Sequence, residues 1–341
     1  MTLEIIGISV LWIFLFGYVM VASIDFGAGF FNAFSTFRGK EHILTRIINR
    51  YLSPVWEVTN VFLVFFFVGI VGFFPKTAYY YGTTLLVPVS IAIVLLAIRG
   101  AYYAFTTYGK LRHKRYVYLY GLTGLFIPAS LSIVLTISEG GFISMEDAGP
   151  VLDYGALFFS PLTWSIVLLS LTAVLYISAV FLTWYAHKAK DEAATSLMRL
   201  YALITAIPMI LTASGIIVEM RSHNFEHYER LMNLWWMFGL SFVLFVGTFY
   251  LLWKKKSYGT ALGLLICQFL LAFFAYGISH YPYLLYPFLT LYDGFTNAAM
   301  ATALIIAFIA GLCLLIPSLY LLLNLFLFNK EYVEGKRNDY A

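Results

Sequence analysis

The sequence has little charge, because Asp, Glu, Lys and Arg together make up only 11% of its 341 residues. Soluble domains average about 25% charged residues. So few charges cannot cover the surfaces of several soluble domains, and the 62% of hydrophobic residues indicates that lipid surrounds most of the chain. Basic patches typical of nucleic-acid binding are also missing, so no nucleic-acid partner is expected.

Cysteine is scarce as well. The two cysteines, Cys267 and Cys313, each lie in a long apolar run, and neither has another cysteine or a histidine nearby at a metal-ligand spacing. We therefore expect two free, buried thiols with no part in a metal centre.

Histidine is missing from the apolar runs, although a heme centre inside the membrane usually needs a histidine ligand. The six histidines fall in connections or at the ends of apolar runs: His42, His113, His187, His223, His227 and His280. The chain is therefore expected to hold no heme by itself. His223 and His227 have the spacing of a helical metal site, but no third ligand has a matching spacing. A solvated turn is favoured for this pair, and no metal ligand is predicted.

Long apolar runs are what the sequence does contain. A helix of about 20 apolar residues crosses the hydrocarbon layer of a bilayer. Nine runs meet this length: 5–34, 55–74, 80–103, 116–137, 161–186, 200–218, 231–253, 258–278 and 298–328. The expected fold is an all-α polytopic membrane protein with nine transmembrane helices.

The basic residues predict the orientation of these helices. Of the 21 lysines and arginines, 18 fall in one alternating set of connections and in the C-terminal tail. Because cytoplasmic loops carry the excess of Lys and Arg, the N-terminus is predicted outside and the C-terminus in the cytoplasm. The pattern of connections repeats after four helices, followed by a last helix.

Three ionisable residues are predicted at the cytoplasmic side of the membrane. Asp25 lies near the end of the first helix, Glu57 near the start of the second, and Arg99 at the end of the third. Charges at membrane depth are costly and usually have a purpose. Two interpretations stay open: a charge-compensated network that fixes helix packing, and a proton entry path in which partial desolvation tunes a carboxylate.

The surroundings of these residues add further candidates. Ser23 and Gly27 are expected to allow a close helix contact beside Asp25. Ser53 and Pro54 are typical of a helix start, so Glu57 has the alternative role of a charge at a helix N-terminus. Asn60, three residues further on, shares the face of Glu57 and is a candidate hydrogen-bond partner.

Three motifs together resemble subunit II of cytochrome bd-type quinol oxidases. They are Ser23-Ile24-Asp25-Phe26-Gly27-Ala28-Gly29 in the first helix, Ser53-Pro54-Val55-Trp56-Glu57 followed by Asn60 in the second, and Arg99-Gly100 in the third. The length, the nine spans and the outside N-terminus are similar to that subunit too. The resemblance extends over essentially the whole chain.

The resemblance implies a fold and a role. It implies a four-helix bundle over 1–137, a second over 138–278, and a segment 279–341 that holds an outer connection, a peripheral ninth helix and the cytoplasmic tail. It also implies a pseudo-symmetric heterodimer with subunit I, which carries heme b, heme d and the quinol site. A small single-helix accessory subunit, membrane lipid and quinone are further partners that it suggests.

The implied reaction is the electrogenic, non-pumping oxidation of quinol by dioxygen in a bacterial cell membrane, with water as the product. This chain would be a subunit of that enzyme, inactive alone, that supports assembly of the heme subunit. By motif position, Glu57 matches an acid implicated in proton entry, and Asp25, Trp56 and Arg99 match residues that the family retains. The chain itself is expected to supply no catalytic residue.

Two other functions stay open. A secondary transporter would use Asp25 and Glu57 as coupling-ion sites, although transporters usually place such groups near the middle of the membrane. A purely structural membrane partner would use the same charges for packing alone.

Overall fold

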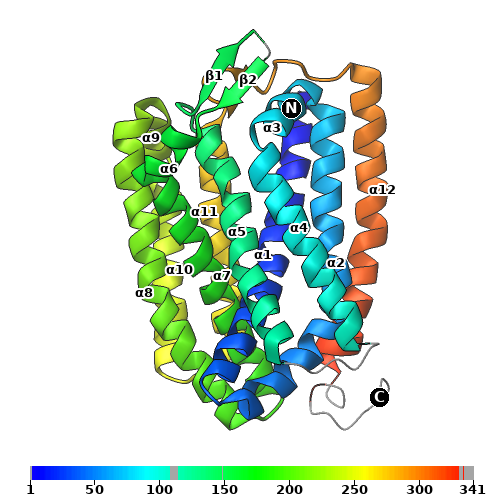
Figure 1. The fold of residues 1–341 in the computed structure, drawn as a ribbon, viewed down its shortest axis with the longest axis vertical. Helices are drawn as coiled ribbons and strands as arrows, with labels where there is room; N and C mark the ends of the chain where they lie inside the picture. Colours follow the sequence, from blue (N-terminus) through cyan, green and yellow to red (C-terminus); the bar gives the residue numbers. More distant parts are fainter. Residues whose placement is uncertain (1, 108–113, 148, 330–332, 334–341) are drawn as a thin grey trace.

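The computed structural model describes residues 2–107, 114–147, 149–329 and 333, apart from the side chains at 46, 49–58, 106, 107, 326 and 328. Long helices stand side by side in one bundle (Figure 1). The helices are α1 (Leu3–Phe37), α2 (Glu41–Phe73), α3 (Pro75–Thr84), α4 (Leu86–Thr107), α5 (Lys114–Ser138), α6 (Tyr154–Phe159), α7 (Pro161–Lys188), α8 (Glu192–His223), α9 (Phe225–Asn233), α10 (Trp235–Trp253), α11 (Tyr258–His280), α12 (Ala298–Leu323) and the π-helix η1 (Asn324–Phe328).

Two short antiparallel hairpins lie at one end of the bundle, beside the N-terminus (Figure 1). One pairs β1 (Ile143–Glu146) with β2 (Gly149–Leu152), and the other pairs β3 (Tyr283–Leu285) with β4 (Leu289–Thr290). A backbone hydrogen bond of 3.0 Å from Tyr286 N to Ser138 O joins the second hairpin to the end of α5. We call this the hairpin end, and the opposite end, where the Lys- and Arg-rich connections lie, the basic end.

Eight helices among the described residues are long and apolar enough to cross a membrane: α1, α4, α5, α7, α8, α10, α11 and α12. The residues 59–73 of α2 pass the same test only together with α3, from which they are bent by 119°. The chain is therefore a multi-pass membrane protein. The ninth crossing, the division into two four-helix bundles and the outside position of the N-terminus stay predictions.

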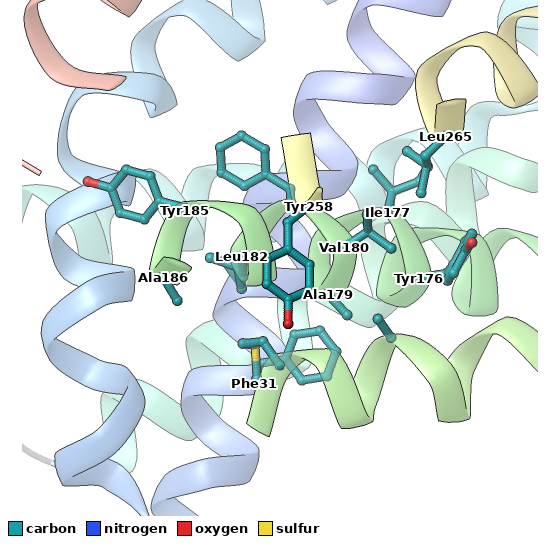
Figure 2. Packing of buried hydrophobic residues seen from close by; sticks show 14 of the residues in the cluster. Phe31, Tyr176, Ile177, Ala179, Val180, Leu182, Tyr185, Ala186, Tyr258 and Leu265 are labelled. Atoms are coloured by element: carbon teal, nitrogen blue, oxygen red, sulfur yellow. The ribbon is translucent and has the colours of Figure 1, made fainter. Parts of the chain in front are cut away.

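Helix α7 lies at the centre of the main apolar core and packs against α8 and α1. Its side chains Tyr176, Leu182 and Tyr185 are at most 1% exposed. Figure 2 shows residues of α1 and α11 gathered around this helix, among them Phe31 and Leu265. Side chains of α7 that do not face this core, such as Trp164 and Leu168, are exposed on the bundle surface. Protein on one side and lipid on the other therefore explain why α7 is apolar throughout rather than amphipathic.

Small residues bring α1 close to its neighbours. A Cβ at Gly27 would lie 2.9 Å from the carbonyl oxygen of Val174 on α7, and one at Gly124 on α5 would collide with the Phe26 carbonyl. The Ser178 hydroxyl of α7 also donates a 3.0 Å hydrogen bond to the Ile24 carbonyl. Such close approaches replace the hydrophobic effect as the force that holds helices together in lipid.

We expect Gly124→Ala to destabilise the protein by about 1–3 kcal/mol, because the added methyl group forces α1 and α5 apart. The measurement is the thermal midpoint of the detergent-solubilised protein. Gly263→Ala is the matched control, since a Cβ there meets nothing within 4 Å. Equal midpoints for the two variants would contradict the close packing of α1 on α5.

The structure corrects the predicted start of the second helix. α2 begins at Glu41, so Ser53 and Pro54 lie inside the helix rather than at its first turn. The reason is tertiary packing: Leu44, Ile47 and Ile48 recur at helical spacing and are at most 3% exposed in the main core.

The prediction of buried cysteines is also wrong. Cys267 and Cys313 are free, as expected, but both are exposed at the surface of the bundle. In a membrane protein an apolar helix face can point to lipid as readily as to the protein interior, so an apolar run does not predict burial.

Candidate functional site

A buried ion pair joins the first and third predicted spans. Arg99 on α4 donates from Nε to Oδ2 of Asp25 on α1 at 3.0 Å, and the side chains are 0% and 3% exposed. Both groups lie inside the bundle, in the part nearer its basic end. The structure thus pairs Arg99 with one of the two predicted carboxylates, as the packing interpretation expects.

The remaining donors of Arg99 are used on backbone and hydroxyl oxygens. Nη2 donates to the Asp25 carbonyl at 2.7 Å, and Nη1 donates to the Tyr120 carbonyl at 2.9 Å and to the Thr123 hydroxyl at 3.4 Å. The guanidinium also lies 3.7 Å from the centroid of the Tyr120 ring, a cation–π contact. Arg99 therefore ties α1, α4 and α5 together.

The local sequence makes room for this arrangement. A Cβ at Gly29, one turn after Asp25 on α1, would lie 2.8 Å from Cε1 of Tyr120 and 3.1 Å from Nη2 of Arg99. Gly29 thus allows the guanidinium and the Tyr120 ring to approach the backbone of α1. The glycine that ends the first sequence motif therefore contributes to the geometry of the ion pair.

Each oxygen of the Asp25 carboxylate accepts a hydrogen bond from another helix. Arg99 donates to Oδ2, and the Tyr120 hydroxyl donates to Oδ1 at 3.0 Å. The two hydrogen bonds connect the carboxylate to α4 and α5. This geometry supports the packing role for Asp25, because both carboxylate oxygens hold neighbouring helices against α1.

Tyr18 is a neighbour that sequence reasoning missed. It lies seven residues before Asp25 on the same face of α1 and is only 4% exposed. Its hydroxyl has no hydrogen-bond partner among the described residues. The only sequence signal for it was a polar aromatic residue two turns from Asp25 inside an apolar helix.

The structure describes the side chains of only some of the other predicted site residues. Ser23 is buried on α1 and Asn60 is half-buried on α2. The side chains of Trp56 and Glu57 lie outside the described residues, although α2 includes both positions. Whether Glu57 faces Asp25 and Arg99 thus stays a prediction.

The described residues do not fit a heme within this chain. His187, His223 and His280 stand in the last turns of their helices, and none of the described histidines lies midway along a membrane-spanning helix. A cavity of about 200 Å³ is lined by seven residues that include no histidine, methionine or cysteine: Phe30, Ala33, Phe34, Phe37, Tyr118, Gly121 and Leu122. No step of a heme reaction is therefore assigned to this chain's residues.

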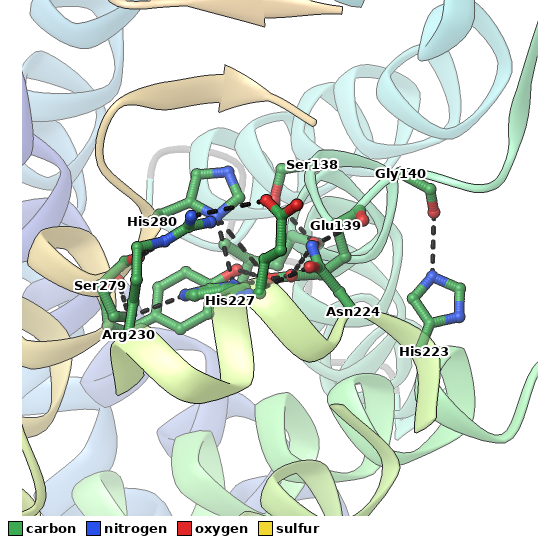
Figure 3. A network of polar contacts seen from close by, with 12 residues as sticks. Ser138, Glu139, Gly140, His223, Asn224, His227, Arg230, Ser279 and His280 are labelled. Carbon is green, nitrogen blue, oxygen red and sulfur yellow. Dashed lines mark hydrogen bonds and ion pairs between the residues drawn. The ribbon is translucent and has the colours of Figure 1, made fainter. Parts of the chain in front are cut away.

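A second polar cluster lies at the hairpin end, where the sequence predicted a solvated turn (Figure 3). That prediction is wrong for His227, whose side chain is fully buried beside Glu139 and His280. It holds for the exposed His223, whose Nε2 lies 2.9 Å from the Gly140 carbonyl. Sequence reasoning missed Glu139, which lies two residues after the predicted span 116–137 and has no basic neighbour in the sequence.

The electrostatics of this second cluster favour an ionised carboxylate. Burial raises the pKa of the Glu139 carboxyl, but the hydrogen bond with His227 and the charges of His280 and His227 outweigh burial. The net result is a pKa below the ordinary value for glutamate. Glu139 is thus a buried anion that needs a positive partner.

An apolar bundle of membrane-spanning helices, crossed by a buried arginine–carboxylate pair, defines the class of this chain: a multi-pass membrane protein with charges fixed inside it. Three comparisons then identify the family. The family model described as cytochrome bd terminal oxidase subunit II matches residues 3–326. The chain belongs to that family and is a protein of the bacterial cytoplasmic membrane.

Two relatives support this assignment. The chain is 36% identical over 338 residues to a protein of Bacillus subtilis (strain 168) named putative cytochrome bd menaquinol oxidase subunit II, covering 96% of this chain and 97% of the relative. It is also similar to a chain in the structure of bd oxidase from Geobacillus thermodenitrificans. That match has a TM-score of 0.85 and 69% identity, and covers 96% of this chain and all of the other.

Proposed function

We propose that this chain is the subunit of a quinol:dioxygen oxidoreductase that ligates no heme itself, supports assembly of the heme-carrying subunit I, and contributes a proton path from the cytoplasm. The subunit is inactive alone. The observation that carries the proposal is the family match along the chain, combined with the finding that none of the described histidines lies midway along a membrane-spanning helix.

The reaction balances as two quinols oxidised per dioxygen, which is reduced by four electrons and takes up four protons to form two waters. The hemes of the complex, heme b and heme d, supply the electron transfer and oxygen chemistry. Menaquinol is the substrate named for the Bacillus subtilis relative, and we propose a quinol of this kind here. Release of quinol protons outside and uptake from the cytoplasm make the reaction electrogenic without a pump.

The orientation follows from charge. Under the positive-inside rule the basic end faces the cytoplasm and the hairpin end faces outside. Asp25 and Arg99 then lie on the side from which protons are taken up. A second acid on that side is the group suited to pass protons, and Glu57 is the candidate because Asp25 is already bonded to Arg99 and Tyr120.

The two acids therefore have different roles in this proposal. Asp25 and Arg99 fix α1, α4 and α5 in place, with Ser23 at the close contact beside them. Glu57, with Trp56 and Asn60 on the same helix, carries the proton. Subunit I, a single-helix accessory subunit, lipid and quinone are the proposed partners of the exposed apolar surface.

Purification through a tag on this chain tests the proposed function. In mild detergent we expect a complex whose reduced-minus-oxidised visible spectrum contains b- and d-type heme bands and which consumes oxygen with menaquinol. The same chain expressed without its partner should show neither property. A complex without heme bands, or heme bands in the chain expressed alone, would contradict the proposal.

A further inference from the structure

Three side chains of types that commonly ligate metal ions come from separate segments and converge at the hairpin end (Figure 3). They are Glu139 in the connection after α5, His227 on α9 and His280 at the end of α11, and their ligand atoms all lie within 4.8 Å of one another. Two of the side chains are fully buried, and that of His280 is 12% exposed. We propose that these three residues bind one divalent metal ion of the zinc class.

The distances between the ligand atoms suit this ion. His227 Nδ1 lies 2.7 Å from Glu139 Oε2 and 3.5 Å from His280 Nδ1, and His280 Nδ1 lies 3.8 Å from Glu139 Oε1. Tetrahedral zinc with bonds of about 2.0–2.1 Å needs its ligand atoms about 3.3 Å apart. The separations of 3.5 and 3.8 Å are close to this value, and binding would widen the 2.7 Å separation between His227 Nδ1 and Glu139 Oε2 and leave the fourth position for water.

The hydrogen bonds around His227 fix which of its nitrogens faces the site. The Ser279 hydroxyl donates its hydrogen to the Tyr276 carbonyl at 2.8 Å, so it accepts the 2.7 Å hydrogen bond from His227 Nε2. Nδ1 then faces Glu139 Oε2 at 2.7 Å. A ring nitrogen and a carboxylate oxygen at this distance are joined by a cation, either a proton or a metal ion.

His280 favours the metal ion over the proton. A proton on His227 Nδ1 satisfies Glu139, but within the described part of the chain it leaves His280 Nδ1 with no partner closer than 3.5 Å. The other ring nitrogen of His280, Nε2, is buried and has no hydrogen-bond partner among the described residues. A metal ion uses all three ligands at once, whereas a proton serves only two of them.

The outer contacts resemble those that orient metal ligands. A ligating histidine usually donates its other ring N–H to a fixed acceptor, as His227 does to Ser279, and a ligating carboxylate is itself hydrogen-bonded. Tyr276 donates to Glu139 Oε1 at 2.6 Å. Asn224 caps α9 by accepting from His227 N at 3.1 Å, and its amide donates to the Glu139 carbonyl at 3.1 Å.

The nearest basic side chain does not occupy the site. Arg230 donates from Nε to the Ser279 carbonyl at 3.0 Å and pairs with the exposed Glu226. A metal held here would join the connection after α5 to α9 and α11. Its role is therefore a clamp that fixes the hairpin end of the protein, far from the ion pair of Asp25 and Arg99.

The test uses the purified oxidase complex, treated with a chelator, freed of it, incubated with Zn²⁺ and desalted. The ratio of zinc to heme iron is then measured by mass spectrometry, with heme iron as the internal count of intact complexes. We expect wild type to retain about one more zinc per complex than His227→Gln or His280→Gln. His223→Gln is the matched control and should retain as much zinc as wild type, because His223 lies outside the three ligands.

Two further measurements keep the proposal falsifiable if a ligand variant fails to assemble. Zinc-edge X-ray absorption of the wild-type complex should report nitrogen and oxygen neighbours at about 2.0–2.1 Å. Ser279→Ala should weaken zinc retention roughly 10- to 100-fold with unchanged heme content. Wild type that retains no zinc, equal zinc in wild type and His227→Gln, or sulfur neighbours in the absorption spectrum would overturn the proposal and leave a cluster held by a proton.

Discussion

Replacing Arg99 with leucine is expected to prevent accumulation of the assembled complex. The variant leaves the Asp25 carboxylate buried without its cation, a change that costs about 3–5 kcal/mol. It also removes the hydrogen bonds to the carbonyls of Asp25 and Tyr120. The measurements are the yield of heme-containing complex per cell membrane and its thermal midpoint.

A double variant distinguishes the effect of the unpaired charge from the effect of the lost arginine contacts. Asp25→Asn combined with Arg99→Leu removes both charges, so we expect it to recover a large part of the yield that Arg99→Leu loses. The single variant Arg99→Lys should also give a low yield, although it keeps the positive charge. An ammonium group cannot reproduce the planar set of contacts that joins α1, α4 and α5. Normal yield and midpoint for Arg99→Leu alone would contradict the structural role of the ion pair.

The second large effect is expected at Glu57. Glu57→Gln keeps the size of the side chain but cannot carry a proton, so oxygen consumption with quinol should fall by about 10²-fold. Heme content should stay at the wild-type level, because the proposed role of Glu57 is proton transfer rather than assembly.

Glu41→Gln is the matched control for this experiment. Glu41 is an exposed carboxylate at the start of the same helix, paired at the surface with Lys114. It should keep full turnover. Full turnover in Glu57→Gln as well would remove the proton path through this residue and leave the subunit a purely structural one.

Sequence reasoning recovered the parts of the fold that depend on the bilayer. The apolar runs match long helices because a backbone in lipid must satisfy its hydrogen bonds within the helix. The pairing of Asp25 with Arg99 was predictable for a similar reason, since two opposite charges at one depth in lipid have few other partners.

Features that depend on tertiary packing were not predictable. The start of α2 before Pro54 and the exposure of Cys267 follow from which faces meet other helices, and periodicity in an apolar helix does not reveal this. The cluster of Glu139, His227 and His280 was missed because its members are separated by 88 and 53 residues. Local spacing paired His227 with His223 instead, but His223 is exposed and lies outside the cluster.

Proton uptake during oxygen reduction tests the central claim most directly, namely that this subunit delivers protons through Glu57 while Asp25 is fixed by Arg99. The fully reduced complex is mixed with oxygen in weak buffer, and a pH-sensitive dye follows uptake at the basic end. We predict that uptake slows about 10²-fold in Glu57→Gln and keeps its wild-type rate in Glu41→Gln. Uptake at the wild-type rate in Glu57→Gln would contradict the account.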